Sequence, residues 1–281
     1  MQGTPPLQTV VEGLAFAEAP RWRGGKLWFS DMYAQTVHCV EPDGRLTTVA
    51  KVPGRPSGLG WLPDGRMLVV SMADRLVLRL EPKGWVEHAN LRQLASFDCN
   101  DMVVDRQGRA YVGNLGFDVF SGAPMQPAAL VMVMPDGKAC TAADGLLFPN
   151  GAVITPDGKT LILAETFGYR LTAFDVAADG SLSGRRSWAE LDGVMPDGIC
   201  LDAEGAIWAG SPLTSEFIRV CEGGRIADRI ACTQPAIACA LGGADGHTLY
   251  MVSGPTTHPG QALATRTGRI DSIRVAVAGV K

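Results

Sequence analysis

No hydrophobic run in this 281-residue sequence approaches the length of a membrane-spanning helix. The longest apolar runs, such as Leu161 to Ala164, stop far short of the ~20 residues that such a helix needs. Positive charge is also sparse, because 25 scattered Lys and Arg stand against 29 Asp and Glu for a formal net charge of −4. We therefore expect no membrane span, and neither nucleic acid nor an anionic membrane as a partner.

The seven cysteines lack the spacings of a zinc cluster or a disulfide framework. Their number is odd, and none forms a C-x-x-C pair; they stand at positions 39, 99, 140, 200, 221, 232 and 239. In a chain of this size the pattern is typical of reduced thiols in a cytosolic protein. The segment from Met1 to Pro6 also lacks the basic stretch and apolar core of a secretory signal. We therefore expect a cytoplasmic protein.

Helical periodicity is almost absent as well, and the best helix candidate, Val86 to Ala95, is short. Glycine and proline are abundant instead, with 34 and 18 residues. Hydrophobic residues make up 46% of the chain and charged residues 19%, which excludes disorder for most of it. This composition predicts many turns, and therefore many short strands, around a sizeable core.

One phrase recurs six times: a start residue, a short apolar run, a turn that ends in glycine, and a second apolar run. The turn glycine follows the start residue by eight positions in five copies and by seven in the first copy. Each phrase is typical of a β-hairpin, because the glycine supplies the positive φ that tight hairpin turns require. The start residues, in chain order, are Glu18, Ser57, Asn100, Asn150, Asp197 and Ala238.

Further strands follow most of the hairpins, such as Val37 to Pro42 and then Leu46 to Ala50. Four strands in each unit of roughly 40 to 45 residues is the spacing of a propeller blade. We therefore predict an all-β protein with a single domain over residues 1–281. Its fold is a six-bladed β-propeller with four-stranded antiparallel blades around a central channel. The segment from Thr9 to Phe16 is expected to complete the last blade and close the ring.

The six start residues are expected to form a ring at one mouth of the channel, where the innermost strands begin. Four of them carry hard oxygen donors: Glu18, Asn100, Asn150 and Asp197. Two carboxylates and two amide oxygens suit Ca²⁺, Mg²⁺ or Mn²⁺. Asn-Gly and Asp-Gly pairs are also ordinary turn dipeptides. Each repeat, however, already has its hairpin turn seven or eight residues later, which favours the metal interpretation.

The ordered set of phrases resembles the SMP-30/gluconolactonase/regucalcin-like family, whose relatives include diisopropyl-fluorophosphatase-type hydrolases. The residues that carry the resemblance are Glu18 to Trp22, Phe29 to Asp31, Asn100 and Asp101 with Asp105 and Gly108, Phe148 to Gly151, and Pro196 to Gly198 with Asp202 and Gly205. The family is known for a six-bladed propeller with one catalytic divalent metal.

The resemblance implies that Glu18, Asn150 and Asp197 bind this metal. It also implies that Asn100 binds the metal directly or contacts metal-bound water and substrate. Vertebrate-like members carry an arginine two residues before that asparagine, where this chain has Asp98, and this departure argues against a sugar lactone. Because members differ in metal preference, Ca²⁺ is the leading candidate, with Zn²⁺, Mn²⁺, Mg²⁺ and Fe²⁺ as alternatives.

A divalent cation in such a cage can polarise a lactone carbonyl. Asp197 then acts as a general base on water or as a nucleophile, and Asn100 orients water or substrate. We therefore predict a metal-dependent hydrolase that opens a lactone, either of a sugar or of another small cyclic ester. Two alternatives stay open: a phosphotriester or fluorophosphate hydrolase at the same metal, and a non-catalytic calcium-binding propeller.

Substrate choice is expected to lie in the loops over the channel mouth. The longest extra segment runs from Gly116 to Pro127, and it is either a lid or a tolerated insertion. The residues expected to contact a small-molecule substrate are Asp98, Phe117, Phe148 and Met195, with Cys99 as a further candidate for an apolar wall. Glu165 and Asp31, at the ends of second strands, are expected to be hydrogen-bonding groups. The sequence leaves the oligomeric state open.

Overall fold

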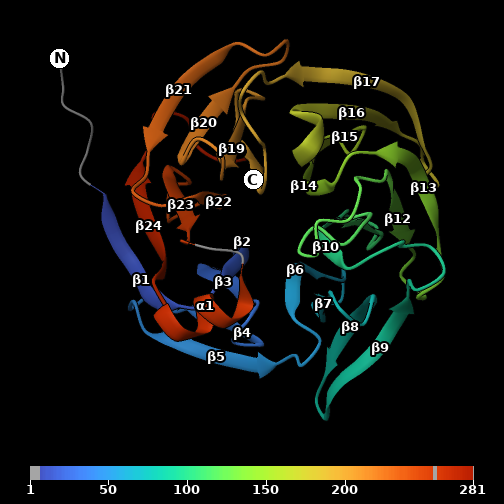
Figure 1. Ribbon diagram of the computed structural model, residues 1–281, viewed down its shortest axis with the longest axis horizontal. Coiled ribbons are helices and arrows are strands. Elements are labelled where there is room, and N and C mark those ends of the chain that lie inside the picture. Colours follow the sequence, from blue (N-terminus) through green and yellow to red (C-terminus); the bar gives the residue numbers. More distant parts are fainter. Residues whose placement is uncertain (1–6, 256–257, 281) are drawn as a thin grey trace.

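Six four-stranded antiparallel sheets surround a central axis in the computed structural model, which describes residues 7–255 and 258–280 (Figure 1). The all-β, six-bladed β-propeller predicted from the repeat spacing is therefore confirmed. Within each blade the strands follow one another outward from the axis, and each pairs antiparallel with its neighbour.

The strands are grouped by their position in the blade. The innermost strands are β2 (Ala17–Arg23), β6 (Pro56–Trp61), β10 (Cys99–Val104), β14 (Pro149–Ile154), β18 (Ile199–Leu201) and β22 (Ala236–Gly242). The second strands are β3 (Lys26–Asp31), β7 (Met67–Ser71), β11 (Ala110–Asn114), β15 (Thr160–Glu165), β19 (Ile207–Ser211) and β23 (Thr248–Ser253). The third strands are β4 (Thr36–Val40), β8 (Leu76–Glu81), β12 (Ala128–Val133), β16 (Arg170–Val176), β20 (Glu216–Val220) and β24 (Gly268–Arg274). The outer strands are β5 (Leu46–Lys51), β9 (Gly84–Asn90), β13 (Ala139–Leu146), β17 (Leu182–Glu190), β21 (Ile226–Ala231) and β1 (Gln8–Leu14).

The last blade is built from two distant parts of the chain. Strand β1 pairs antiparallel with β24, from Gln8 opposite Ser272 to Leu14 opposite Gly268, in a sheet of order β1-β24-β23-β22. The predicted closure of the ring by the segment around Thr9 is therefore confirmed. Because β1 belongs to the sixth blade and leads directly into β2 of the first, the hydrogen bonds between β1 and β24 close the ring.

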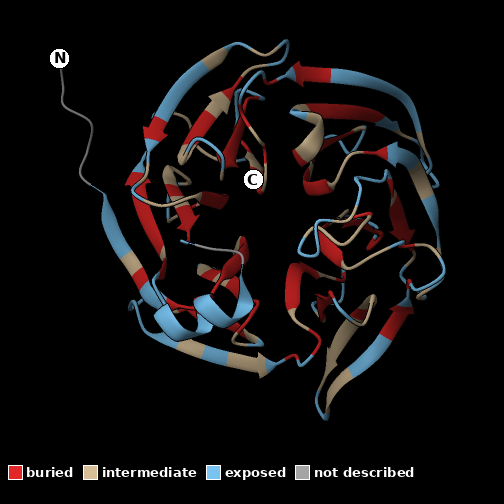
Figure 2. Ribbon diagram, viewed as in Figure 1, coloured by how far each residue is buried: buried red, intermediate tan, exposed pale blue. Residues whose placement is uncertain are grey.

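The hydrophobic core lies between the faces of neighbouring blades, and not in one central mass. One cluster, for example, joins Val37 and Ala19 of the first blade to Leu59 and Val69 of the second. The innermost strands of neighbouring blades contact each other all the way around the ring. Figure 2 shows the result, in which the inner strands are mostly buried and the outer strands carry the exposed residues. Each blade is thus held by two neighbours.

The predicted helix from Val86 to Ala95 is wrong. Residues up to Asn90 form β9, which pairs with β8 from Leu76 opposite Asn90 to Glu81 opposite Gly84. The free edge of β8 requires a strand partner, and this tertiary pairing overrides a weak local helical pattern. Among the described residues the one α-helix is α1 (Pro259–Thr265), and none of their helices is long and apolar enough to cross a membrane.

The segment that follows β24 runs back toward the axis (Figure 1). Gly279 forms a bridge with Asp202 and donates its N–H to the Gly246 carbonyl. Val280 lines a cavity together with parts of β2, β14, β18 and β22, toward the ends of these inner strands that lie opposite their start residues. This segment therefore packs against the fifth and sixth blades at the end of the hub opposite the start residues.

Candidate metal centre

The inner strands change register where the predicted ring residues stand. The shift lies between Glu18 and Arg21 in β2, between Cys99 and Met102 in β10, and between Pro149 and Ala152 in β14. Such bulges interrupt the strict alternation of side chains and reorient them. Glu18, Asn100 and Asn150 each occupy such a break, at the start of an inner strand.

The glycines after Asn150 and Asp197 allow neighbouring blades to approach closely. A Cβ atom on Gly151 would lie 2.6 Å from the Ile199 nitrogen, and one on Gly198 would lie 2.3 Å from the Ala238 Cβ. The Gly151 N–H donates to the Asp197 carbonyl at 3.2 Å, which links the fourth blade to the fifth. The Asn-Gly and Asp-Gly pairs therefore serve the packing of the hub, and neither is a hairpin turn.

The structure brings all four predicted oxygen donors to one cavity of about 260 Å³. Glu18, Asn100 and Asn150 are buried, and Asp197 is half-buried. The other side chains around the cavity are largely apolar. They are Phe16, Met32, Tyr33, Met72, Leu115, Val119, Phe120, Phe148, Thr166, Phe167, Met195 and Pro212.

A threonine fixes the orientation of the Asn150 amide. The Thr166 hydroxyl donates to the Pro196 carbonyl at 2.9 Å, and it accepts a hydrogen bond from Asn150 Nδ2 at 3.0 Å. A hydroxyl has a single hydrogen, so Thr166 must be the acceptor toward Asn150. The amide nitrogen therefore faces Thr166, and the buried Asn150 Oδ1 has no hydrogen-bond partner.

Asn100 has its oxygen engaged. The Ser57 hydroxyl donates to Asn100 Oδ1 at 3.2 Å, and the Ser57 carbonyl in turn accepts a hydrogen bond from Ser30 at 3.0 Å. This arrangement leaves the amide N–H₂ of Asn100 as the group available to the cavity. Asn100 is therefore placed to donate a hydrogen bond to a molecule in the cavity.

The two carboxylates of the cavity are held in a strongly unfavourable environment. Burial raises the pKa of Glu18 well above its usual range, and the nearby carboxylates of Asp197 and Asp101 raise it further. Burial likewise raises the pKa of Asp197 to about 8, against a lowering by Asn150 and a further increase from Asp101. Asp197 Oδ1 is buried without a hydrogen-bond partner.

These residues fit a divalent cation. The unpartnered oxygens of Asn150 and Asp197 are hard donors, and the Glu18 carboxylate adds a second negative charge. A cation would satisfy both oxygens and remove the repulsion between the carboxylates. Among residues 7–255 and 258–280 there is no group of three or more His, Cys, Asp or Glu side chains that could hold a metal ion. The candidate set instead combines two carboxylates, of Glu18 and Asp197, with the amide oxygen of Asn150.

An ion pair beside the cavity was not among the predicted site residues. Arg21 Nη2 lies 2.6 Å from Asp101 Oδ1, and the guanidinium also donates to the carbonyls of Leu59 and Met102 at 3.2 and 2.8 Å. Asp101 follows Asn100 on β10, while Arg21 lines the cavity at the far end of the channel. The pair therefore lies between the two cavities. Both residues fall within the motifs that carried the family resemblance, and these motifs were the sequence signal from which the ion pair could have been found.

A second ring of buried polar residues supports the first. Asp31 accepts hydrogen bonds from the N–H groups of Ala15 and Phe16, both at 2.9 Å. Glu165 accepts one from Leu147 N–H at 2.8 Å, so the prediction that both residues are hydrogen-bonding groups is confirmed. The buried residues that end the six second strands are Asp31, Ser71, Asn114, Glu165, Ser211 and Ser253. Asp31 and Glu165 fasten the segments that lead into β2 and β14.

The predicted substrate-binding residues divide into two groups. Phe148 and Met195 line the cavity, whereas Asp98, Phe117 and Cys99 are not among its lining residues. Asp98 is paired with Arg55 at 2.5 Å, and Phe117 packs against Phe167 with ring centroids 5.9 Å apart.

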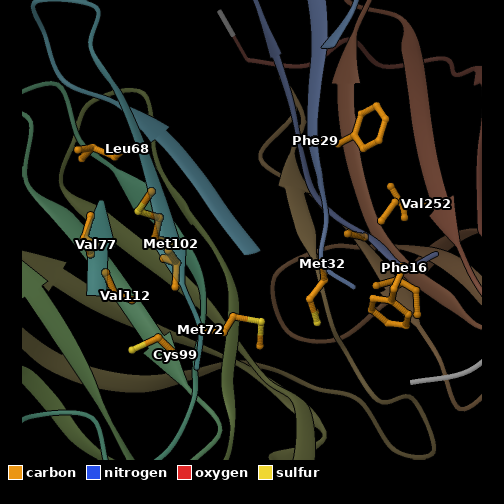
Figure 3. Close-up of a cluster of buried hydrophobic side chains, with 14 of the residues drawn as sticks. Phe16, Phe29, Met32, Leu68, Met72, Val77, Cys99, Met102, Val112 and Val252 are labelled. Atoms are coloured by element: carbon orange, nitrogen blue, oxygen red, sulfur yellow. The ribbon is translucent and has the colours of Figure 1, made fainter. Parts of the chain in front are cut away.

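Cys99 is fully buried in the core. Figure 3 places it beside Met72, while Phe16 and Met32 lie together on the opposite side of the view. The backbone of Phe148 has a φ of +59°, which is unusual for a bulky residue and typical of a strained position at a site.

Six blades around an oxygen-lined hub define a β-propeller with a candidate cation site. The family described as SMP-30/Gluconolactonase/LRE-like region matches residues 16–255, so this chain belongs to that family. The resemblance drawn from the motifs is therefore confirmed.

Individual relatives are distant. Regucalcin from Danio rerio is 28% identical over 187 residues, which cover 65% of this chain and 63% of that protein, or less than two thirds of its length. Regucalcin from Xenopus laevis is 26% identical over 259 residues, which cover 87% and 85%. Gluconolactonase from Zymomonas mobilis is 22% identical over 241 residues, which cover 74% and 67%.

Solved structures of similar shape share the fold. A luciferin-regenerating enzyme aligns with a TM-score of 0.83 at 20% identity, over 98% of this chain and 97% of that one. A calcium-binding regucalcin from Agrobacterium tumefaciens aligns with a TM-score of 0.81 at 20% identity, over 98% and 96%. A gluconolactonase from Xanthomonas campestris aligns with a TM-score of 0.78 at 21% identity, over 97% and 90%.

Proposed function

We propose that this protein is a divalent-cation-dependent hydrolase that opens the ring of a small lactone. The observation that carries the proposal is the pair of unpartnered buried oxygens, on Asn150 and Asp197, beside the Glu18 carboxylate in one cavity. Relatives named gluconolactonase and a calcium-binding regucalcin support this choice of reaction and of cation. Ca²⁺ is the preferred ion, since the donors are all hard oxygens.

Glu18, Asn150 and Asp197 would hold the cation, which when bound supplies a Lewis acid that polarises a carbonyl oxygen. The Thr166 hydroxyl keeps the oxygen of Asn150 directed to the cavity. The Asn100 amide N–H₂ donates a hydrogen bond to the substrate or to the attacking water. It thereby orients the reacting groups.

Asp197 can act in two ways. As a general base it accepts the proton of a water molecule whose oxygen attacks the lactone carbonyl carbon. As a nucleophile its own carboxylate oxygen attacks that carbon and displaces the ring oxygen, and water then hydrolyses the mixed anhydride between Asp197 and the opened acyl group. In both routes the ring C–O bond breaks, the alkoxide oxygen takes up a proton, and the product is a hydroxy acid.

Purified protein in a pH-stat assay tests the proposal. Acid release from a panel of lactones should require a divalent cation, stop with a chelator and return when Ca²⁺ is added. Turnover of a phosphotriester in place of every lactone would favour hydrolysis at phosphorus. Cation binding without any hydrolysis would favour a non-catalytic calcium-binding propeller.

Substitution of the carboxylates tests the site itself. Asp197→Ala should lower kcat/KM by about 10³-fold or more, because it removes the base or nucleophile. Glu18→Gln should weaken cation binding, measured by isothermal titration calorimetry, because it removes one negative charge from the cation site. Wild-type rates in Asp197→Ala, or wild-type affinity in Glu18→Gln, would refute the assignment.

The seven cysteines are all free thiols. We propose a cytoplasmic protein on this basis, since reduced thiols persist in that compartment. A small molecule is the proposed partner of the cavity.

A further inference from the structure

We propose that the substrate is a lactone that carries an apolar substituent, an alkyl or aryl group, in place of the hydroxyl groups of a sugar. This inference rests on the proposed lactone hydrolysis and specifies the class of molecule on which it acts. Three features of the cavity carry it: an apolar wall, a lack of cationic side chains, and an organised loop that adds hydrophobic residues.

The polar groups of the cavity come mainly from the starts of the inner strands. They are Glu18, Asn100, Asn150 and Asp197, together with Thr166, and the other lining residues are phenylalanine, methionine, leucine, valine and proline side chains and Tyr33. Three of the wall residues are phenylalanines or methionines of the main core cluster: Phe16, Met32 and Met72. The part of a substrate that extends from the reacting carbonyl therefore meets hydrocarbon and aromatic surface.

Among the residues that the structure describes, the cavity offers no cationic side chain that could bind the hydroxyl groups of a sugar. No arginine, lysine or histidine belongs to the residues that line the cavity within the described chain. Arg55, the guanidinium that pairs with Asp98, is committed to that carboxylate at 2.5 Å. A polyhydroxylated ring against this wall would leave its hydroxyl groups without partners, which costs free energy for each group desolvated.

The loop from Gly116 to Pro127 forms part of the wall. Asp118 organises it, because Asp118 Oδ1 accepts hydrogen bonds from the N–H groups of Phe120 and Ser121, each at 3.1 Å. Gly116 brings the two ends of the loop together, since a Cβ there would lie 2.6 Å from the Gln126 carbonyl oxygen. The loop thereby presents Val119 and Phe120 to the cavity.

Aromatic contacts continue the loop surface across to the neighbouring blade. Phe117 packs on Phe167, and Phe167 meets Phe148 edge to face with centroids 5.0 Å apart. Phe167 and Phe148 both line the cavity. This chain of rings holds the loop against η1 (Thr166–Gly168), so the wall is pre-formed and favours an apolar ligand without reorganisation.

A homologous series of substrates tests the proposal. With Ca²⁺-loaded wild-type protein, kcat/KM is measured for γ-butyrolactone, for γ-lactones with progressively longer alkyl chains, and for glucono-δ-lactone. We expect kcat/KM to rise about fourfold for each methylene that enters the cavity. The rise should end when the chain outgrows the space of about 260 Å³. Glucono-δ-lactone should be the poorer substrate.

A variant of the loop assigns the selectivity to the wall. Phe120 is 41% exposed, so Phe120→Ser should fold normally. It should lower the ratio of kcat/KM for a pentyl-substituted lactone to that for γ-butyrolactone by about fivefold, because a ring contact with the chain is lost. The control is Leu46→Ser on the outer strand β5, where Leu46 is 43% exposed and distant from the cavity, and the ratio should not change.

Calorimetry with non-hydrolysable γ-lactams that carry the same alkyl chains measures binding without hydrolysis. It therefore separates the proposed lactone hydrolysis from the proposed preference for an apolar substituent. If glucono-δ-lactone is preferred and alkyl chains bring no gain, the apolar substrate is refuted and the lactonase stands. If no lactone is hydrolysed, the lactonase is refuted. In that case a lactam affinity that rises with the length of the alkyl chain supports an apolar ligand. A lactam affinity that does not change with chain length overturns the proposal of an apolar ligand.

Discussion

Thr166 determines which atom of Asn150 faces the cavity. Thr166→Val keeps the shape of the side chain but removes the acceptor for Asn150 Nδ2, so the amide is free to turn. We expect cation affinity to fall about tenfold or more, as is usual when the partner of a metal ligand is lost. Calorimetric titration with Ca²⁺ measures this. Thr166→Ser, which restores a hydroxyl, should recover most of the affinity, and equal affinity in all three proteins would contradict the assignment.

The raised pKa values of the cavity carboxylates predict how the cation-free protein responds to pH. Burial raises the pKa of folded Asp197 from 3.8 to about 8, and the pKa of Glu18 is raised as well. Below the unfolded pKa both states are protonated, and stability does not depend on these groups. Between the two values the unfolded state loses its protons first, so stability decreases as pH rises from about 4 to about 8.

Melting temperatures in the presence of a chelator test this dependence between pH 5 and pH 8. The melting temperature of the cation-free protein should fall by several degrees as the pH rises. This fall is measured relative to the Asp197→Asn variant, which has no ionisable group at position 197. Excess Ca²⁺ should reverse the trend, because a cation binds the ionised carboxylates in preference to protons. A melting temperature that is independent of pH with and without Ca²⁺ would show that these groups are not coupled to stability.

Repeat position predicted from sequence that Glu18, Asn100, Asn150 and Asp197 lie together, because equivalent residues in a propeller occupy equivalent places, and these four residues line one cavity. It did not identify Thr166 or Asp101. Thr166 stands 16 residues from Asn150 and 30 from Pro196, and its role exists only once the loops of two blades meet. Asp98 illustrates the same limit, because only the fold places the guanidinium of Arg55 beside it.

The inner strands of neighbouring blades can approach closely only because glycine follows Asn150 and Asp197. A Cβ on Gly151 would lie 2.6 Å from the Ile199 nitrogen and 2.7 Å from the Asp197 carbonyl oxygen. Gly151→Ala should therefore lower the free energy of unfolding by about 2 kcal/mol, because backbone atoms of two blades must separate. It should also weaken cation binding, since Asn150 and Asp197 move apart.

Urea denaturation and Ca²⁺ titration measure these effects. Gly260→Ala is the matched control, because nothing lies within 4 Å of the added methyl group and the site is helical. That control should leave stability unchanged or raise it by up to about 1 kcal/mol. Equal stability of the two variants would show that the inner strands tolerate separation.

The segment from Val86 to Asn90 forms part of an outer strand, where a helix was predicted. The segment after Val86 has enough alternate polar and apolar residues to fit more than one period, and β9 uses it as an outer strand. Trp85 Nε1 donates to the Lys51 carbonyl of the neighbouring blade at 2.8 Å, which anchors the start of this strand. Such contacts between blades are absent from any local window of sequence, so periodicity alone failed here.

The whole molecule is closed by a single strand pairing between distant segments. Val11 is buried in the main core cluster, whereas Gln8 of the same strand is exposed. Val11→Asp should lower the free energy of unfolding by about 3 kcal/mol or more, because it buries a charge without a partner and loosens the closure. Denaturant titration measures the change, and Gln8→Asp should stay within about 0.5 kcal/mol of wild type. Similar losses in both variants would contradict the importance of this closure.

Most of the architecture was predictable because one unit is repeated six times. Spacing fixed the number of blades, and the turn glycines fixed the hairpins within each of them. The segment around Thr9 was assigned to the last blade because that blade lacked a strand. The loop from Gly116 to Pro127 was the part that spacing left undecided, since an insertion has no counterpart in the other repeats.

The Arg21–Asp101 ion pair lies between the cavity of the candidate cation site and the cavity that Val280 lines at the opposite end of the inner strands. A cation that approached from that opposite end would meet the positive guanidinium of Arg21, so we expect ion and organic molecule to enter from the side that Phe120 lines. A tightly bound inhibitor should then slow the removal of the ion by a chelator.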